Sequence, residues 1–259
     1  MKIIVIVLML ILVFLIKTNN NIEKFSENNI IHKTYFINLD KSVDRRNNLE
    51  KNSHENNIKL TRFPAYYGKD LDKQKLYKDG IFDKFIFRTK DGMIGCTLSH
   101  LKLWEKISNG NDEIVLILED DVLFADNFWD KFNKYYSQLP ADWDIAYLGA
   151  SNIYGKKVSE NLIKPIYGTK SLTNVGAYGM LVRKKNMDKM LKAMTPVSKD
   201  FDIQLRDNYN KNSNIYYFNP PIILHDNTID SDRRVIDGST PKSGYKWRNH
   251  IQGKITTLN

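Results

Sequence analysis

Residues Ile114–Val122, IVLILEDDV, are the stretch of sequence that decides the fold. The first five residues are all apolar, which is typical of a central strand that is buried on both faces of a sheet. Three acidic residues then follow without interruption, Glu119, Asp120 and Asp121. The stretch therefore predicts a buried strand whose carboxyl end carries a cluster of negative charge.

This acidic cluster indicates a site for a divalent cation. Adjacent carboxylates repel one another, and the hard cations Mg²⁺ and Mn²⁺ are bound by oxygen ligands. In open α/β sheets, ligands bind at the carboxyl ends of the strands. A metal held by only one or two carboxylates keeps coordination positions free for diphosphate oxygens. The alternative is a solvated acidic loop after a strand, because three acidic residues alone are a pattern of low specificity.

Strand and helix signals alternate along the rest of the chain, which predicts an α/β layered sheet rather than a helical bundle or a β-sandwich. The other expected strands are Thr34–Leu39, Ile145–Leu148 and Gly179–Val182. The expected helices are Val43–Asn56, Met93–Ser108 and Lys184–Met194. Ser42 and Asp44 suit the cap and the first turn of the first of these helices. The methionines of the last helix form one face, which we expect to lie in the core.

The charge balance is basic, with 39 Lys and Arg residues against 30 Asp and Glu residues and a net charge of +9. These cations are scattered along the whole chain, and no zinc-finger spacing or recognition-helix signature accompanies them. We therefore expect a generally basic surface and no nucleic-acid partner. Cys96 is the only cysteine, which excludes an intrachain disulfide.

The two ends of the chain differ from its body. An apolar run of 14 residues, from Ile3 to Ile16, lies between two lysines, and no small-residue cleavage pattern follows it. We expect residues 1–17 to be an uncleaved signal anchor of a single-pass membrane protein, rather than a removed leader or a buried first element. We expect residues 18–29 to be a polar linker, residues 30–237 a globular domain, and residues 238–259 a basic tail or a loop that orders on a ligand.

Four segments, in the same order along the chain, together resemble glycosyltransferase family 25, the lipooligosaccharide and procollagen galactosyltransferase group. They are YFINLDKSVDRR at Tyr35–Arg46, GMIGCTLSHLKLWEKI at Gly92–Ile107, LILEDDV at Leu116–Val122 and GAYGMLV at Gly176–Val182. The resemblance implies a Rossmann-like nucleotide-sugar transferase fold of type A with a mixed, mostly parallel sheet. It also implies an Mn²⁺ or Mg²⁺ site and inverting transfer of a hexose, often galactose, from a UDP-sugar. The implied acceptor is a hydroxyl of a glycan or of a hydroxylysine-type residue.

The resemblance implies metal-binding roles for individual residues. Glu119 and Asp121 match the outer members of the family's acid-x-acid metal motif, and Asp120 would face the ribose or the sugar of the donor. A further metal ligand from a later part of the sequence is also expected in this fold, and His225 in PPIILHDN is the candidate. Asp226 and Ser231 lie close to it in the sequence and are expected to form hydrogen bonds with the metal ligands.

The resemblance also implies contacts to the nucleotide, from Asn38, Asp40, Arg45, Arg46, Ser99 and His100. An arginine after the first strand can neutralise phosphate, although at least one of the two arginines also suits an exposed helical turn. A histidine on an apolar helix likewise also suits a structural role. Asp202 matches the family's late aspartate and is the expected base for the acceptor hydroxyl, with Asp200 as the second candidate. Both aspartates also suit the acidic start of a helix.

Two other classes of function remain open at this point. One is a catalytically inactive module of the same fold, used for adhesion or as a scaffold, which the intact acidic cluster disfavours. The other is a metal-dependent nucleotidyltransferase or phosphotransferase. No glycine-rich phosphate loop of the G-x-x-x-x-G-K-[ST] type occurs in the sequence, which disfavours this second class.

Overall fold

The computed structural model describes residues 30–168, 173–226 and 256–258. Nine of the described strands form one sheet, in the order β11-β6-β7-β9-β5-β8-β3-β1-β2. Only β7 and β8 run opposite to the other seven strands of this described sheet. The bounds are β1 Lys33–Asn38, β2 Leu60–Pro64, β3 Ile114–Glu119, β5 Ile145–Ser151, β6 Tyr154–Ser159, β7 Leu162–Pro165, β8 Val175–Arg183, β9 Ile215–Phe218 and β11 Thr256–Leu258. The expected α/β fold with a mixed, mostly parallel sheet is confirmed.

A small second sheet lies beside the end of β3. It consists of β4, Val122–Phe124, and β10, Ile223–His225, which pair antiparallel. Because β3 ends at Glu119 and β4 begins at Val122, Asp120 and Asp121 connect the two sheets.

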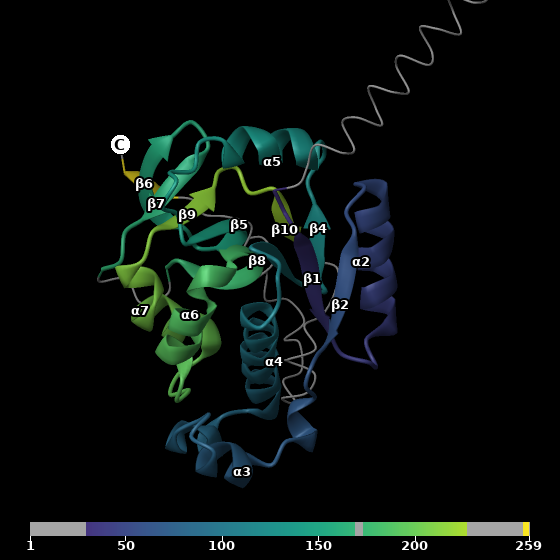
Figure 1. The fold of residues 1–259 in the computed structure, drawn as a ribbon, viewed down its shortest axis with the longest axis vertical. Helices are drawn as coiled ribbons and strands as arrows, with labels where there is room; N and C mark the ends of the chain where they lie inside the picture. The colour runs from purple at the N-terminus through teal and green to yellow at the C-terminus, as the bar shows by residue number, and fades with distance from the viewer. Residues whose placement is uncertain (1–29, 169–172, 227–255, 259) are drawn as a thin grey trace, which may run out of the picture. The chain divides into compact units, whose positions relative to one another are not determined.

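Helices cover both faces of the main sheet (Figure 1). Tyr35 and Ile37 of β1 belong to one core with side chains of α4, α6 and α7, whereas Phe36 between them is buried outside that core. On the other face, the ring of Tyr135 in α5 lies 5.4 Å from the ring of Phe218 in β9. The alternation of side chains along a strand thus explains why both faces are buried. The helices are α2 Val43–Glu55, α3 Lys73–Lys78, α4 Asp91–Ser108, α5 Phe128–Tyr136, α6 Met187–Met194 and α7 Phe201–Asn208, with short 3-10 helices η1 Gly68–Asp70, η2 Lys84–Arg88, η3 Lys184–Asn186 and η4 Asn210–Asn212.

The strands and helices expected from the sequence are confirmed, with small shifts at their ends. The helix expected at 184–194 begins with the 3-10 turn η3 before it becomes α6. The methionine face, Met187, Met190 and Met194, is fully buried, as expected for a core. Ser42 is the N-cap residue of α2, but its side chain makes no capping hydrogen bond.

The prediction of a single-pass membrane location requires correction. No helix within residues 30–168, 173–226 and 256–258 is long and apolar enough to cross a membrane. The predicted anchor, residues 1–17, and the predicted linker, residues 18–29, lie outside the described residues. Of the predicted tail, residues 238–259, the structure describes Thr256–Leu258, which form β11 beside β6.

Candidate active site

The acidic cluster lies at the carboxyl end of β3 and is neutralised by groups that follow β1. Arg45, in the first turn of α2, forms an ion pair with Asp120 and a second one, of 2.7 Å, with Asp121. The side-chain amide of Asn38, the last residue of β1, donates a hydrogen bond of 2.6 Å to Asp120. All four side chains are largely buried, and the carboxylates of Asp120 and Asp121 are less than a tenth exposed. Parallel pairing of β1 with β3 is what brings these groups together.

Arg62 on β2 extends this network to the exposed edge of the sheet. Its Nε donates to the side-chain oxygen of Asn38 at 2.9 Å, and its Nη2 donates to the backbone oxygen of Asn38 at 3.0 Å. The same nitrogen pairs with Asp40, whose side chain is almost fully exposed. Asn38 is therefore held from two sides, with Arg62 on one and Asp120 on the other, which fixes its rotamer.

His225 reaches the acidic cluster because two glycines allow β10 to approach the main sheet. Gly149 of β5 and Gly179 of β8 are paired across the sheet. A Cβ atom at Gly149 would lie 2.4 Å from the backbone oxygen of Ile223, so a side chain there would displace β10. With β10 in this position, the Nε2 atom of His225 lies 3.3 Å from a carboxylate oxygen of Asp121. The next residue, Asp226, donates its backbone N–H to the backbone oxygen of Asp121 at 2.7 Å.

The two outer carboxylates of the cluster have opposite electrostatic environments. Burial and the neighbouring charge of Asp121 raise the pKa of Glu119 to about 7. Burial also opposes ionisation of Asp121, but the hydrogen bond with His225 and the charge of Arg45 outweigh it, and the pKa of Asp121 lies below its ordinary value. Asp121 is therefore an anion at neutral pH.

Two observations bear on whether these residues fit a divalent cation. One oxygen of Asp121, Oδ1, is buried and has no hydrogen-bond partner among the described residues, so it is free to bind a cation. The described residues contain no ready-made group of three or more metal-ligating side chains. The chemistry of the donor set, hard carboxylate oxygens with an imidazole beside them, nevertheless suits Mn²⁺ or Mg²⁺ when a diphosphate supplies the remaining oxygens.

Asp202, on the first turn of α7, lies against the start of β8. Its carboxylate accepts hydrogen bonds from the backbone N–H groups of Gly176, at 3.2 Å, and of Ile203, at 2.9 Å. Gly176 lies three residues before Gly179 in β8. Gly179 pairs with Leu118 near the end of β3. The register of β8 thus brings Asp202 to the same edge of the sheet as the acidic cluster.

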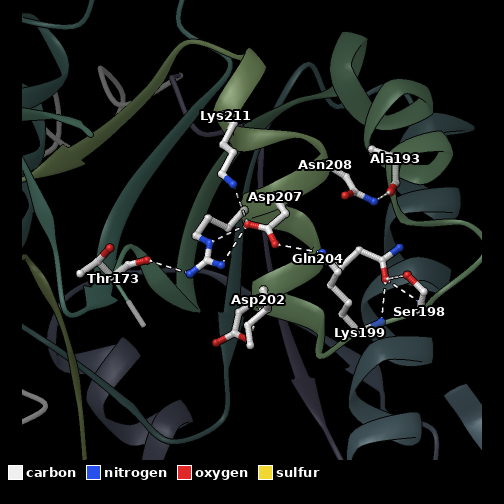
Figure 2. A network of polar contacts seen from close by, with 11 residues as sticks. Thr173, Ala193, Ser198, Lys199, Asp202, Gln204, Asp207, Asn208 and Lys211 are labelled. Atoms are coloured by element: carbon white, nitrogen blue, oxygen red, sulfur yellow. Dashed lines mark hydrogen bonds and ion pairs between the residues drawn. The ribbon is translucent and has the colours of Figure 1, made fainter. Parts of the chain in front are cut away.

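Ion pairs around Asp207 anchor the far end of α7 (Figure 2). Asp207 pairs with Lys199 at 3.1 Å, with Arg206 at 2.9 Å and with Lys211 at 3.1 Å. Gln204 of the same helix accepts from the backbone N–H of Ser198 at 2.7 Å. These contacts fix the helix that carries Asp202.

We expect Asp207→Asn to lower the free energy of unfolding at pH 7 by about 1 kcal/mol. Partial burial raises the pKa of Asp207, but its three cationic partners outweigh burial and lower it to about 2. A carboxyl group with a lowered pKa in the folded protein stabilises the fold above its ordinary pKa, and this contribution is lost as the pH falls from about 4 to about 2. The deficit measured by urea unfolding should be smaller at pH 3 than at pH 7. Glu50→Gln, at an exposed position of α2, is the control, and an equal deficit for Asp207→Asn at both pH values would contradict the assignment.

Three residues expected at the nucleotide have other surroundings. Ser99 is buried and accepts the backbone N–H of Tyr66 at 2.9 Å. His100 is buried against the ring of Phe201, at 4.2 Å, and its Nδ1 bonds to the backbone oxygen of Cys96 at 3.0 Å. Burial lowers the pKa of His100 to about 4, so the ring is neutral, which fits the structural alternative. Within the described part of the chain, Arg45 and not Arg46 pairs with the acidic cluster.

Two residues of the site carried no signal in the sequence. Arg62 joins the network only because β2 pairs with β1, and neither strand's register can be read from its own residues. The ring of Tyr178 in β8 lies 5.9 Å from the ring of His225, and burial raises the pKa of Tyr178 to about 12. Tyr178 belongs to a mostly apolar strand, so the sequence predicts only that its side chain lies in the core. Ser231 lies outside the described residues.

Comparisons with known proteins agree with the segments that suggested the family. The family model described as glycosyltransferase family 25 (LPS biosynthesis protein) matches residues 31–205. A "Glycosyltransferase 25 family member" of Aedes aegypti is 30% identical over 74% of this chain and 35% of its own length. "Procollagen galactosyltransferase 1-B" of Xenopus laevis is 29% identical over 62% of this chain and 28% of its own length. Among solved structures, the galactosyltransferase LgtC in complex with donor and acceptor sugar analogs has a TM-score of 0.43 and 12% identity, over 85% of this chain and 100% of that chain.

The chain spans about a third of the length of the curated relatives it matches. The matched residues, 31–205, cover more than half of the chain and contain β1, α4, β3 and most of the acidic site. The chain therefore belongs to glycosyltransferase family 25.

Proposed function

We propose that this protein transfers a hexose, in the first instance galactose, from a UDP-sugar to a hydroxyl group of a glycan or of a hydroxylysine-type acceptor, with inversion at the anomeric carbon. The observation that carries the proposal is the buried network of Arg45, Asn38, Asp120 and Asp121 at the carboxyl end of β3. The galactosyltransferase names among the relatives support the choice of sugar. The descriptions "LPS biosynthesis" and "procollagen" support the two acceptor classes.

The residues divide into those that hold the donor and those that activate the acceptor. Asp121, with Glu119 and His225, would hold a divalent cation, Mn²⁺ or Mg²⁺. When bound, such an ion supplies positive charge for the departing diphosphate. Arg62 and Asp40 would bind the nucleoside, and Asn38, buried between Arg62 and Asp120, would position those two side chains. Asp120 would orient the ribose or the sugar, and the guanidinium group of Arg45 would pair with a diphosphate oxygen.

Asp202 is the proposed base that takes the proton of the acceptor hydroxyl as its oxygen attacks the anomeric carbon. The two backbone N–H groups that bond to it orient its carboxylate. The bond from the anomeric carbon to the diphosphate breaks as the new glycosidic bond forms, and the electron pair leaves with the diphosphate.

A thermal-shift panel on the full chain tests the proposed donor. UDP-galactose with Mn²⁺ should raise the melting temperature more than UDP-galactose alone, and more than GDP-mannose with Mn²⁺, because a ligand that binds the folded state stabilises it. The absence of a shift with every UDP ligand would instead favour a non-catalytic module of the same fold.

We expect Arg45→Gln to change the affinities for metal and for diphosphate in opposite directions. Arg45 neutralises Asp120 and Asp121 when no other cation is present, so its removal should tighten Mn²⁺ binding to the nucleotide-free protein. Loss of a charge-assisted hydrogen bond should weaken UDP binding by about 10- to 100-fold. Mn²⁺ titration by electron paramagnetic resonance and UDP titration by calorimetry measure the two effects. Arg46→Gln is the comparison, and equal losses at both positions would contradict a specific role for Arg45.

A further inference from the structure

The loop Ala65–Tyr67, between β2 and η1, is held tightly against α4. The backbone N–H of Tyr66 donates to the hydroxyl of Ser99 at 2.9 Å, and that hydroxyl donates to the backbone oxygen of Gly95 at 2.6 Å. A Cβ atom at Gly95 would lie 2.5 Å from the backbone oxygen of Tyr66 and 2.8 Å from the nitrogen of Gly68. Only glycine at position 95 permits this approach, so α4 fixes the position of the loop.

The same loop exposes the ring of Tyr66. Tyr66 is 39% exposed although its backbone is fixed, whereas most large apolar side chains of the described residues are buried. One face of the next ring, Tyr67, is covered by the ammonium group of Lys41, 4.5 Å from the ring centre. Tyr66 is therefore the aromatic surface that this loop presents. A ring on a fixed backbone loses little conformational entropy when a ligand packs on it.

Tyr66 lies next to the network that would hold the donor. The backbone N–H of Ala65 donates to the backbone oxygen of Asn38 at 3.0 Å, and the side chain of Asn38 contacts both Arg62 and Asp120. Tyr66 thus follows β2 at the carboxyl edge of the parallel strands β1 and β2, and it is the next residue after Ala65, which contacts that network directly.

We propose that the nucleobase of the donor stacks on Tyr66, and that Ser99 and Gly95 are positioning residues that fix Tyr66 for this contact. The inference rests on the proposed function and deepens it, since it assigns the base-binding part of the same site. It also gives a role to the spacing of Gly95 and Ser99. Residues four apart lie on the same face of a helix, and here that face of α4 contacts the loop.

Calorimetric titration of the full chain with UDP and with inorganic pyrophosphate, both with Mn²⁺ present, tests this assignment. Tyr66→Leu should weaken UDP binding about tenfold and leave pyrophosphate binding unchanged, because pyrophosphate has no base to stack. Tyr66→Phe should bind UDP within about twofold of the wild type, since the ring is retained. Phe87→Leu, at an aromatic residue of η2 that is 45% exposed, is the matched control and should change neither affinity.

A double-mutant cycle tests the positioning role. Ser99→Ala should weaken UDP binding in the wild type but have no further effect in Tyr66→Leu, because the hydroxyl acts through Tyr66. Equal weakening of UDP and pyrophosphate by Tyr66→Leu would overturn the stacking assignment, as would unchanged UDP binding, and the proposed transferase function would stand in both cases. A wild-type protein that binds neither ligand would overturn the proposed function together with this inference.

Discussion

Asp121→Asn should reduce the rate of sugar transfer by about 10³-fold, which corresponds to roughly 4 kcal/mol of lost transition-state stabilisation. The substitution keeps the size of the side chain but removes a buried negative charge that Arg45 and His225 contact in the folded protein. It also replaces one of the two carboxylate oxygens with an amide NH2 group, which cannot bind a cation, at a side chain whose Oδ1 has no hydrogen-bond partner among the described residues. The loss should appear in kcat/KM for UDP-galactose and as weaker Mn²⁺ binding by electron paramagnetic resonance.

The control for this substitution is Asp126→Asn, an exposed aspartate five residues further along the chain. It changes the net charge by the same amount without touching the cluster, and it should leave both measurements within about twofold, as is usual for surface positions. Far-ultraviolet circular dichroism should show that both variants are folded. Transfer at the wild-type rate by Asp121→Asn would exclude this residue as a metal ligand.

Asp202→Asn should reduce turnover by about 10³-fold and leave UDP binding unchanged. General base catalysis contributes about 10²- to 10⁴-fold, and an amide cannot accept the acceptor's proton at neutral pH. The carboxylate of Asp202 contacts Gly176 and Ile203 and is not part of the network that would hold the donor, so the affinity for UDP should not change. Single-turnover kinetics with a saturating donor, together with calorimetry of UDP binding, separate the two effects.

Asp200→Asn is the matched control for the base, because Asp200 precedes α7 by one residue and is the other acidic candidate. Its side chain makes no capping hydrogen bond to the helix, so the substitution should cost little stability. If turnover fell in Asp200→Asn and persisted in Asp202→Asn, the general base would be Asp200 and not Asp202.

The local sequence predicted the strands and helices whose periodicity is strong. β1, β3 and α4 were predictable because runs of apolar residues define their buried faces, and Met187, Met190 and Met194 were correctly predicted as core. β6, which reads YGKKVS and is exposed over three residues, was not predictable from the sequence, because a polar strand lacks a distinct apolar pattern. β4 and β10 were not predictable either, because each has only three residues and its one strand partner is the other.

The sequence by itself determined that three carboxylates end a buried strand, because the apolar residues Ile114–Leu118 are followed directly by Glu119, Asp120 and Asp121. Only the tertiary structure decided what surrounds them. Asn38 meets Asp120 across 82 positions of sequence, and His225 meets Asp121 only because Gly149 and Gly179 allow β10 to lie on the sheet. Strand register and close backbone approach depend on contacts between distant segments, and no local pattern of residues specifies those contacts.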